Sequence, residues 1–157
     1  METACERPVR GLDVKSFPAF CRARSLKCTA QRLAVFASVR AATHHPSVDE
    51  TWRDVQRTIP TITRESVYRI LNELKDLGLI GRLDAFSSAH YDTNLKPHAH
   101  FVCETCGTII DYPLPDTIPL PEGLPKIQNH LELRVTGTCE DCRLKNRRSR
   151  RRTAAAR

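Results

Sequence analysis

Two Cys-x-x-Cys pairs constrain the second half of this chain more than any other feature. Cys103 and Cys106 form the first pair, Cys139 and Cys142 form the second, and 32 residues separate the two pairs. Reduced thiols at this spacing favour zinc, and four of them supply a closed tetrahedral site whose expected role is structural. The alternative is a redox dithiol, which needs a strand-to-helix context. Each pair here lies beside strand-like sequence, so we predict Zn²⁺ bound by all four cysteines.

The first half of the chain has the apolar spacing of helices, with repeated start and stop signals. Thr29, Ser47 and Thr63 are predicted N-caps, because a hydroxyl there accepts a hydrogen bond from the first helical turn. Ser47 also begins a capping box. Pro60 and Gly78 are predicted to end the last two helices. The expected helices are residues 17–24, one that follows Thr29, residues 47–59 and residues 64–77.

Strand-like segments follow these helices. Residues 79–84 and 90–92, separated by a polar turn at Ser87 and Ser88, are typical of a two-stranded hairpin. Three helices followed by a hairpin form the layout of a winged helix-turn-helix, whose last helix enters the major groove of DNA. A plain helical bundle with a solvated face is the competing interpretation.

The apolar spacing changes towards a period of two after Lys96 and Pro97. Strands are predicted at residues 100–103, 108–112 and 131–135, and the proline-dense connection from Pro113 to Pro125 is too broken for a long helix. The second domain is therefore expected to be small and β-rich. The hydrophobic core of so small a domain usually needs an additional crosslink, and a bound zinc ion supplies one. The predicted organisation is a helical domain at 1–92, a hinge at 93–97 and a zinc-stapled domain at 98–142.

Charge is distributed unevenly along this chain, whose formal net charge is +7. Residues 1–97 hold 15 Lys and Arg against 11 Asp and Glu, and residues 98–142 hold 2 against 7. A basic first half suits a polyanionic partner, and an acidic middle suits cations. Residues 143–157 hold 8 basic residues and no acidic one. They are predicted to form a disordered basic tail that attracts phosphates regardless of sequence.

Several protein classes are not expected. The apolar runs fall well short of the roughly 20 residues of a membrane helix, and the N-terminus lacks the apolar core of a signal peptide. We therefore expect a soluble cytoplasmic protein with no membrane partner. The sequence has no glycine-rich phosphate loop or activated nucleophile motif, so an enzyme is not expected. The remaining thiols, Cys5, Cys21 and Cys28, are interpreted as buried or incidental.

A second group of possible metal ligands precedes and overlaps the first cysteine pair. His98 and His100 lie two residues apart on a predicted strand, so both imidazoles face the same side. Asp92 and Asp111 flank them, and mixed nitrogen and oxygen donors suit iron, manganese or zinc. The alternative is that the histidines are ordinary surface or core residues. The grouping predicts a metal site that is distinct from the thiolates.

The combined order of these motifs resembles the ferric uptake regulator (Fur) family of metal-dependent DNA-binding repressors, over the range from about Leu26 to Cys142. The matching segments are Thr29-Ala30-Gln31-Arg32, His45-Pro46-Ser47, Ser66-Val67-Tyr68-Arg69, His98-x-His100-x-x-Cys103-x-x-Cys106-Gly107 and Cys139-x-x-Cys142. The resemblance implies an α+β fold. An N-terminal winged helix-turn-helix would bind DNA, and a small α/β domain with the four-cysteine zinc site would form a homodimer.

The resemblance also implies a regulatory metal, Fe²⁺ or Mn²⁺. Its expected ligands are His45, Asp92, His98, His100 and Asp111. His45 comes from the helical half of the chain, so one ion bound to it and to the other ligands would fix the orientation of the two domains. Metal binding that favours one arrangement of the domains shifts the population towards it, which makes the ion a co-repressor. His44 is an alternative ligand at this position.

Aspartates at positions 92 and 111 resemble the peroxide-sensing (PerR-type) branch, because iron-sensing members usually carry glutamates there. In that branch iron(II) reacts with hydrogen peroxide and the oxidant formed attacks a histidine ligand, which by position would be His45 or His98. The expected function is a metal-dependent repressor of peroxide-stress genes that leaves DNA on this oxidation. The alternative is an iron- or other metal-uptake regulator without peroxide sensing.

The resemblance places Tyr68 where the recognition helix reaches base edges, with Arg64, Ser66 and Arg69 as further DNA-binding candidates. Two-fold symmetric dimers bind inverted repeats, so the expected partner is double-stranded DNA with a palindromic operator. Two hypotheses of other classes remain: a metal hydrolase or oxygenase that uses the His/Asp group, and a zinc-dependent adaptor that binds a protein partner.

Overall fold

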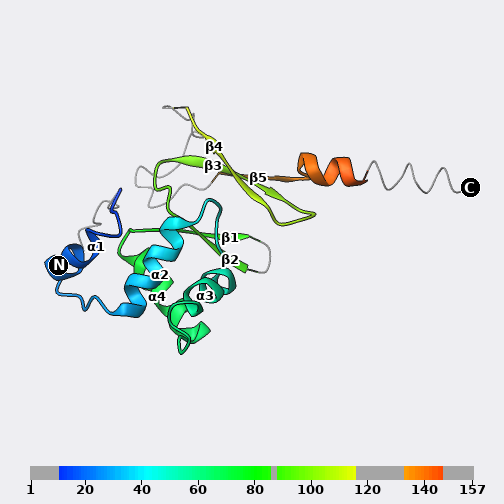
Figure 1. Cartoon of the computed structure of the whole chain (residues 1–157). Coiled ribbons are helices and arrows are strands. Elements are labelled where there is room, and N and C mark those ends of the chain that lie inside the picture. The colour runs from blue at the N-terminus through cyan, green and yellow to red at the C-terminus, as the bar shows by residue number, and fades with distance from the viewer. Residues whose placement is uncertain (1–10, 86–87, 116–132, 147–157) are drawn as a thin grey trace, which may run out of the picture. The chain divides into compact units, whose positions relative to one another are not determined.

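The computed structural model describes residues 11–85, 88–115 and 133–146, and the chain divides into two compact units, Met1–Leu95 and Lys96–Arg157 (Figure 1). The division falls between Leu95 and Lys96, inside the segment 93–97 for which a hinge is predicted. The first unit combines helices with a two-stranded sheet, and the second is built on a three-stranded sheet.

The helices of the first unit begin where the capping hydroxyls predict. The side chains of Thr29, Ser47 and Thr63 each accept a hydrogen bond from a backbone N–H three residues further on, and Glu50 completes a capping box with Ser47. These N-caps are confirmed. The helices are α1 (Phe17–Ala23), α2 (Ala30–Ala41), α3 (Val48–Gln56) and α4 (Arg64–Asp76).

Helix α3 ends at Gln56, three residues before the predicted end at Ile59. The N–H groups of Thr58 and Ile59 both still donate to the carbonyl of Val55, at 3.0 and 2.9 Å, so the chain leaves the helix through a tightened last turn. Pro60 disfavours helical backbone at Ile59, the residue before it, so the helix does not continue beyond this turn. Helix α4 ends as predicted, with Gly78 in the left-handed region at φ 67°.

The hairpin is formed by β1 (Gly81–Ala85) and β2 (Ser88–Asp92), which pair antiparallel with Gly81 opposite Asp92. The first strand begins two residues later than predicted, because Leu79 and Ile80 are buried in the helical core rather than paired in the sheet. Ser88 belongs to the second strand rather than to the turn, and Ser87 lies outside the described residues. A winged helix-turn-helix, rather than a plain bundle, is confirmed.

The second unit contains a sheet of order β4-β3-β5, in which β3 pairs antiparallel with β4 and parallel with β5. Its strands are β3 (His98–Cys103), β4 (Ile109–Pro113) and β5 (Leu133–Gly137). β3 begins two residues before the predicted start and ends where predicted, and β4 is shifted by one residue. β5 ends two residues later than predicted, and the first two residues predicted for it lie outside the described residues. Residues 140–146 are helical and reach four residues into the segment predicted to be a disordered tail, and the rest of that tail lies outside the described residues.

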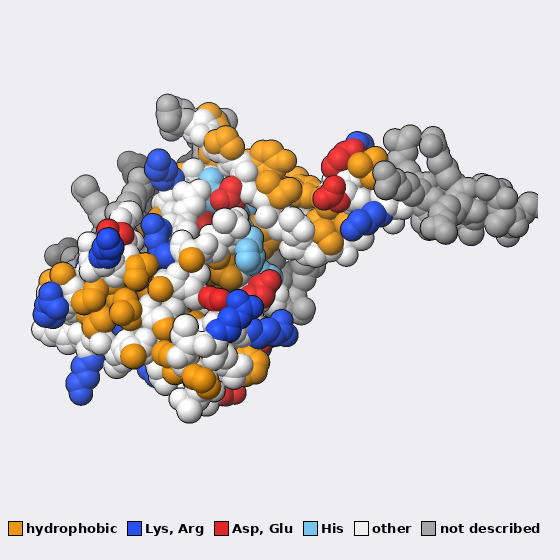
Figure 2. Space-filling model, in the orientation of Figure 1, with side chains coloured by type: hydrophobic (Ala, Val, Ile, Leu, Met, Phe, Trp, Pro, Cys, Tyr) orange, Lys and Arg blue, Asp and Glu red, His pale blue; other side chains and the backbone are white. Residues whose placement is uncertain are grey.

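The sheet of the second unit presents apolar side chains to solvent. Ile110 and Tyr112 on β4 and Val135 on β5 are all exposed, and hydrophobic side chains gather over these strands in Figure 2. The buried apolar side chains among the described residues of this unit are Val102, Cys103 and Cys142. Apolar burial within the described part is therefore slight. Across the described ranges, none of the helices has the length and apolar character of a membrane span.

Candidate metal centres and nucleic-acid interface

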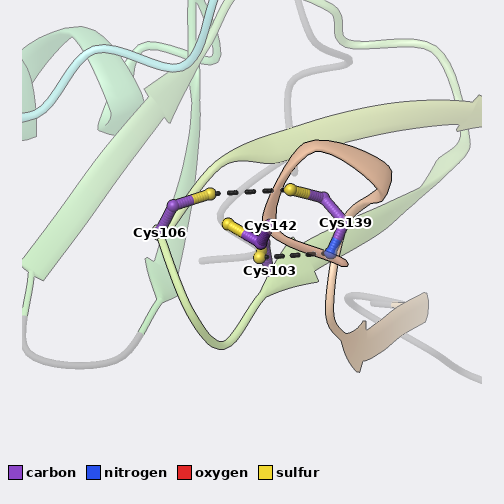
Figure 3. Close-up of side chains that lie close together, drawn as sticks. All are labelled: Cys103, Cys106, Cys139 and Cys142. Carbon is purple, nitrogen blue, oxygen red and sulfur yellow. Dashed lines mark hydrogen bonds between the residues drawn. The ribbon is translucent and has the colours of Figure 1, made fainter. Parts of the chain in front are cut away.

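The four cysteines of the Cys-x-x-Cys pairs converge in the second unit (Figure 3). Their four sulfur atoms all lie within 4.8 Å of one another, and Cys106 Sγ lies 3.8 Å from Cys139 Sγ. Tetrahedral zinc with Zn–S bonds of about 2.3 Å places its sulfur ligands about 3.8 Å apart. The donor set and its spacing therefore fit zinc.

The backbone at each pair directs the sulfurs inward. The N–H of Gly107 donates to the carbonyl of Cys103 at 2.8 Å, and Gly107 adopts φ 74°, a left-handed conformation that glycine accepts without cost. From the other pair, the N–H of Cys139 donates to Cys103 Sγ at 3.3 Å (Figure 3). The turn after β3 and the segment after β5 thus meet at the sulfur cluster.

The thiols of Cys103, Cys106 and Cys142 differ in acidity. The backbone hydrogen bond from Cys139 lowers the pKa of Cys103 to about 6, and hydrogen bonds from Thr108 lower the pKa of Cys106. A hydrogen bond with Cys106, together with desolvation and the nearby Cys103 charge, raises the pKa of Cys142 to about 12. Four thiolates therefore need a cation to coexist at neutral pH, because each added negative charge opposes the next deprotonation.

A second cluster in the same unit joins β3 to β4. His100 lies directly opposite Asp111 in the strand register, and His98 projects from the same face of β3 as His100. His98 Nε2 lies 2.7 Å from His100 Nε2, and these two nitrogens lie 3.6 and 3.7 Å from Asp111 Oδ1. Ligand atoms around an ion with bonds of about 2.1 Å lie roughly 3–4 Å apart. The two distances to Asp111 fall in this range, and the two imidazole nitrogens lie slightly closer together than two ligands of one ion.

The ring orientation of His98 also suits a ligand. Its Nδ1 lies 2.7 Å from the carbonyl oxygen of Lys96, an interaction in which the ring nitrogen is the donor. A proton on Nδ1 leaves the lone pair on Nε2, the atom that faces His100 and Asp111. Hydrogen bonds of this kind fix the tautomer of histidines that bind metals.

The first unit holds the other two predicted ligands. His45 and Asp92 are both buried, and His45 Nε2 lies 3.9 Å from Asp92 Oδ1. The backbone N–H of Asn94 donates to that same carboxylate oxygen at 2.7 Å, which holds the Asp92 side chain in place. His44 is exposed and lies 3.7 Å from Glu50 instead. His45 rather than His44 therefore accompanies Asp92.

The DNA-binding candidates lie along α4 and differ in their partners. Arg64 is hydrogen-bonded to Asp49 of α3, and the hydroxyl of Ser66 accepts a hydrogen bond from Thr63 at 3.1 Å. Arg69 donates to Glu73 at 2.7 Å within the same helix. Each of these three side chains is thus held by another residue of the unit.

Tyr68 is 45% exposed at the surface of α4, and the wing supplies one of its contacts. Hydrogen bonds with Asn72 and with Arg82 of β1 lower the pKa of the Tyr68 phenol. Arg82 also donates to Asp84 at 2.8 and 3.0 Å. Arg82 therefore links the wing to the recognition helix, a role that sequence patterns did not indicate because the contact joins separate elements.

The comparison with protein families decides the ancestry of this chain. The sequence model of the ferric uptake regulator family matches residues 23–130. The chain belongs to the ferric uptake regulator family. The match includes His45, Asp92, Cys103 and Cys106 and ends before the second cysteine pair.

Individual relatives lie in two branches of this family. The peroxide-responsive repressor PerR of Staphylococcus epidermidis is 27% identical over 130 residues, which cover 80% of this chain and 87% of that protein. The ferric uptake regulator Fur of Helicobacter pylori has a similar fold, with a TM-score of 0.67 and 23% identity, over 85% of this chain and 96% of that one. The Campylobacter jejuni peroxide stress regulator superposes with a TM-score of 0.57 and 25% identity, over 79% and 97%. The predicted Fur-like α+β fold is confirmed.

Proposed function

We propose that this protein is a metal-dependent DNA-binding repressor of peroxide-stress genes. In this proposal a structural Zn²⁺ is held by the four cysteines, and the second unit forms a homodimer. The winged helix-turn-helix of each protomer then binds one half of a palindromic operator through α4, with Tyr68 reading bases and Arg64, Ser66 and Arg69 contacting bases or phosphates.

The observation that carries the proposal is the cluster of His98, His100 and Asp111 at ligand spacing, in a chain whose other unit is a winged helix. We propose that one Fe²⁺ or Mn²⁺ binds these three residues together with His45 and Asp92. Imidazole nitrogens and carboxylate oxygens are donors that suit both ions. An ion held by both units would favour one arrangement of them. If that arrangement binds DNA, the rise in DNA affinity is limited by how far the ion shifts the equilibrium towards it.

Two features support a response to hydrogen peroxide. The carboxylate ligands are aspartates, as the peroxide-sensing branch has them, and relatives at 27% identity are peroxide-responsive repressors. Bound iron(II) would supply one-electron chemistry with peroxide. As ligands, His45 and His98 would place imidazole carbons next to the iron, and these rings are the expected sites where an oxygen atom is added. Loss of an imidazole donor then removes the metal and weakens DNA binding.

The alternative is an iron- or other metal-uptake regulator without peroxide sensing. Arg69 on the recognition helix resembles iron regulators more than some peroxide regulators, which bears on the operator sequence. The test is an electrophoretic shift on promoter DNA with protein loaded with either metal. Our proposal predicts that peroxide releases the iron-loaded protein, with a single oxygen gained on His45 or His98 by mass spectrometry, and leaves the manganese-loaded protein bound. Equal resistance of both forms would favour the uptake regulator, and no shift with any metal would favour the adaptor.

A further inference from the structure

Two cysteines outside the metal clusters lie near one another in the first unit. Cys21 is in the last turn of α1 and is fully buried in the core, whereas Cys28 is exposed and directly precedes Thr29, the N-cap of α2. Cys28 lies near enough to Cys21 to raise the pKa of its thiol. The sequence alone favoured incidental thiols here, because a spacing of seven residues matches no disulfide or metal motif.

The turn between α1 and α2 brings these thiols together. The N–H of Leu26 donates to the carbonyl of Cys21 at 2.8 Å, and the N–H of Ser25 donates to that of Arg22 at 3.1 Å. Ser25 has φ 55°, in the left-handed region. These three features make up a Schellman motif, which ends a helix and reverses the chain. Leu26 then packs against the core, so the backbone holds Cys28 close to Cys21.

The surroundings of the pair give the two sulfurs different roles. Burial raises the pKa of the Cys21 thiol, the neighbouring Cys28 raises it further, and the nearby guanidinium of Arg32 opposes both effects. Cys21 is therefore the sulfur that stays protonated and shielded. Cys28 is the sulfur that a small oxidant in solution reaches first, since oxidation requires an accessible thiol.

We propose that Cys21 and Cys28 are a reversible thiol–disulfide site that hydrogen peroxide oxidises without any metal. The Cys28 sulfur attacks one peroxide oxygen, the O–O bond breaks, and Cys28 sulfenic acid and water form. The Cys21 sulfur then attacks the sulfenic sulfur, and the S–S bond forms as the S–O bond breaks. The hydroxyl leaves with the proton from Cys21 as a second water. Peroxide gains two electrons, and the two thiols lose them.

This site differs from both proposed metal centres and does not rest on the proposed function. It lies next to a series of charged contacts that leads to the recognition helix. Arg32 donates to the carbonyl of Lys27, the neighbour of Cys28, and to Glu73 of α4 at 2.6 Å, and Glu73 in turn accepts from Arg69. A disulfide would therefore add a covalent restraint where this series begins.

The test treats the full-length, zinc-containing, iron-free protein with graded hydrogen peroxide, measures its zinc, then blocks remaining thiols with iodoacetamide in denaturant and digests without reductant. Trypsin cuts after Lys15, Arg22, Lys27 and Arg32, so the disulfide would join peptide 16–22 to peptide 28–32. We expect this linked pair to appear while zinc is retained, and to disappear after dithiothreitol. Tryptophan fluorescence checks that the first unit stays folded.

Cys28→Ser is the matched variant, because the exposed side chain can change without disturbing the core, and it should abolish the linked pair without changing zinc content. Three results would overturn the proposal: Cys21 still fully alkylated after Cys28 has been oxidised, Cys28 joined to Cys5 instead, or a Cys21–Cys28 link that forms only after zinc has been lost.

Discussion

Replacement of Cys142 by serine is expected to unfold the second unit while the first unit stays folded. Cys142 is buried, and its sulfur belongs to the cluster in which all four sulfur atoms lie within 4.8 Å of one another. A serine hydroxyl is a poor zinc ligand, since structural zinc sites of this kind use thiolates. The substitution therefore removes one of the four ligands that hold the turn after β3 to the segment after β5.

The expected magnitude follows from how little else is buried there. Val102 is the one buried aliphatic side chain among the described residues of the second unit, and burial of a valine stabilises by about 1.5–3 kcal/mol. Structural zinc contributes roughly 10 kcal/mol or more of apparent binding free energy. Whole domains are stable by only about 5–15 kcal/mol. The free energy lost with zinc is therefore expected to exceed the free energy of unfolding of this unit.

The assay separates the two units. Trp52 is the one tryptophan of the chain, lies in the first unit and donates its indole N–H to the carbonyl of Ile62 at 3.0 Å. Its fluorescence reports on that unit, and hydrogen exchange of the β3 amides reports on the second. Cys142→Ser should leave the fluorescence spectrum unchanged and remove the protection of β3, with zinc content falling towards zero.

Cys28→Ser is the control, because Cys28 is an exposed thiol outside the sulfur cluster. It should change neither zinc content nor β3 protection. Protected β3 amides in Cys142→Ser, or in wild-type protein stripped of zinc by a chelator, would refute the reasoning that zinc rather than apolar burial holds this unit together.

Three smaller perturbations test the first unit. Ser47→Ala removes an N-cap and should lower its unfolding free energy by about 1 kcal/mol in a urea titration followed by tryptophan fluorescence; an unchanged midpoint would contradict the cap. Burial opposes the ionisation of Glu73, but Arg32 outweighs it and the carboxyl pKa is lowered. The stabilisation is therefore present above the unfolded pKa of about 4.3 and lost as pH falls through the folded pKa, so the stability gap to Glu73→Gln should shrink below about pH 4 rather than stay constant. Arg82→Gln should raise the pKa of Tyr68 in an NMR titration and weaken discrimination for operator DNA with little change in salt dependence; a salt slope reduced by about 1 would instead identify a phosphate contact.

Local signals made much of the fold predictable. The hydroxyls of Thr29, Ser47 and Thr63 each begin a helix, because capping depends on residues within one turn. The four-cysteine cluster was predictable for a different reason: thiolate spacing itself specifies the ion that holds distant segments together. The end of α3 was predicted three residues late because Pro60 marks where a helix cannot continue and not where its regular hydrogen bonding stops.

Contacts between elements were not predictable from spacing. The proximity of Cys21 and Cys28 depends on Ser25 in a left-handed conformation, which serine seldom adopts and which no sequence signal indicated. The contact between Arg82 and Tyr68 joins the wing to the recognition helix, and its formation depends on how the two elements pack. Composition and periodicity do not contain such information.

Anomalous diffraction from a crystal of the manganese-loaded, full-length protein tests the central claim most directly, because it locates the regulatory ion together with its ligands. The account predicts one manganese bound to His45 and Asp92 of the first unit and to His98, His100 and Asp111 of the second. Manganese bound by the second unit alone, with His45 remote from it, would contradict the claim that the ion couples the two units.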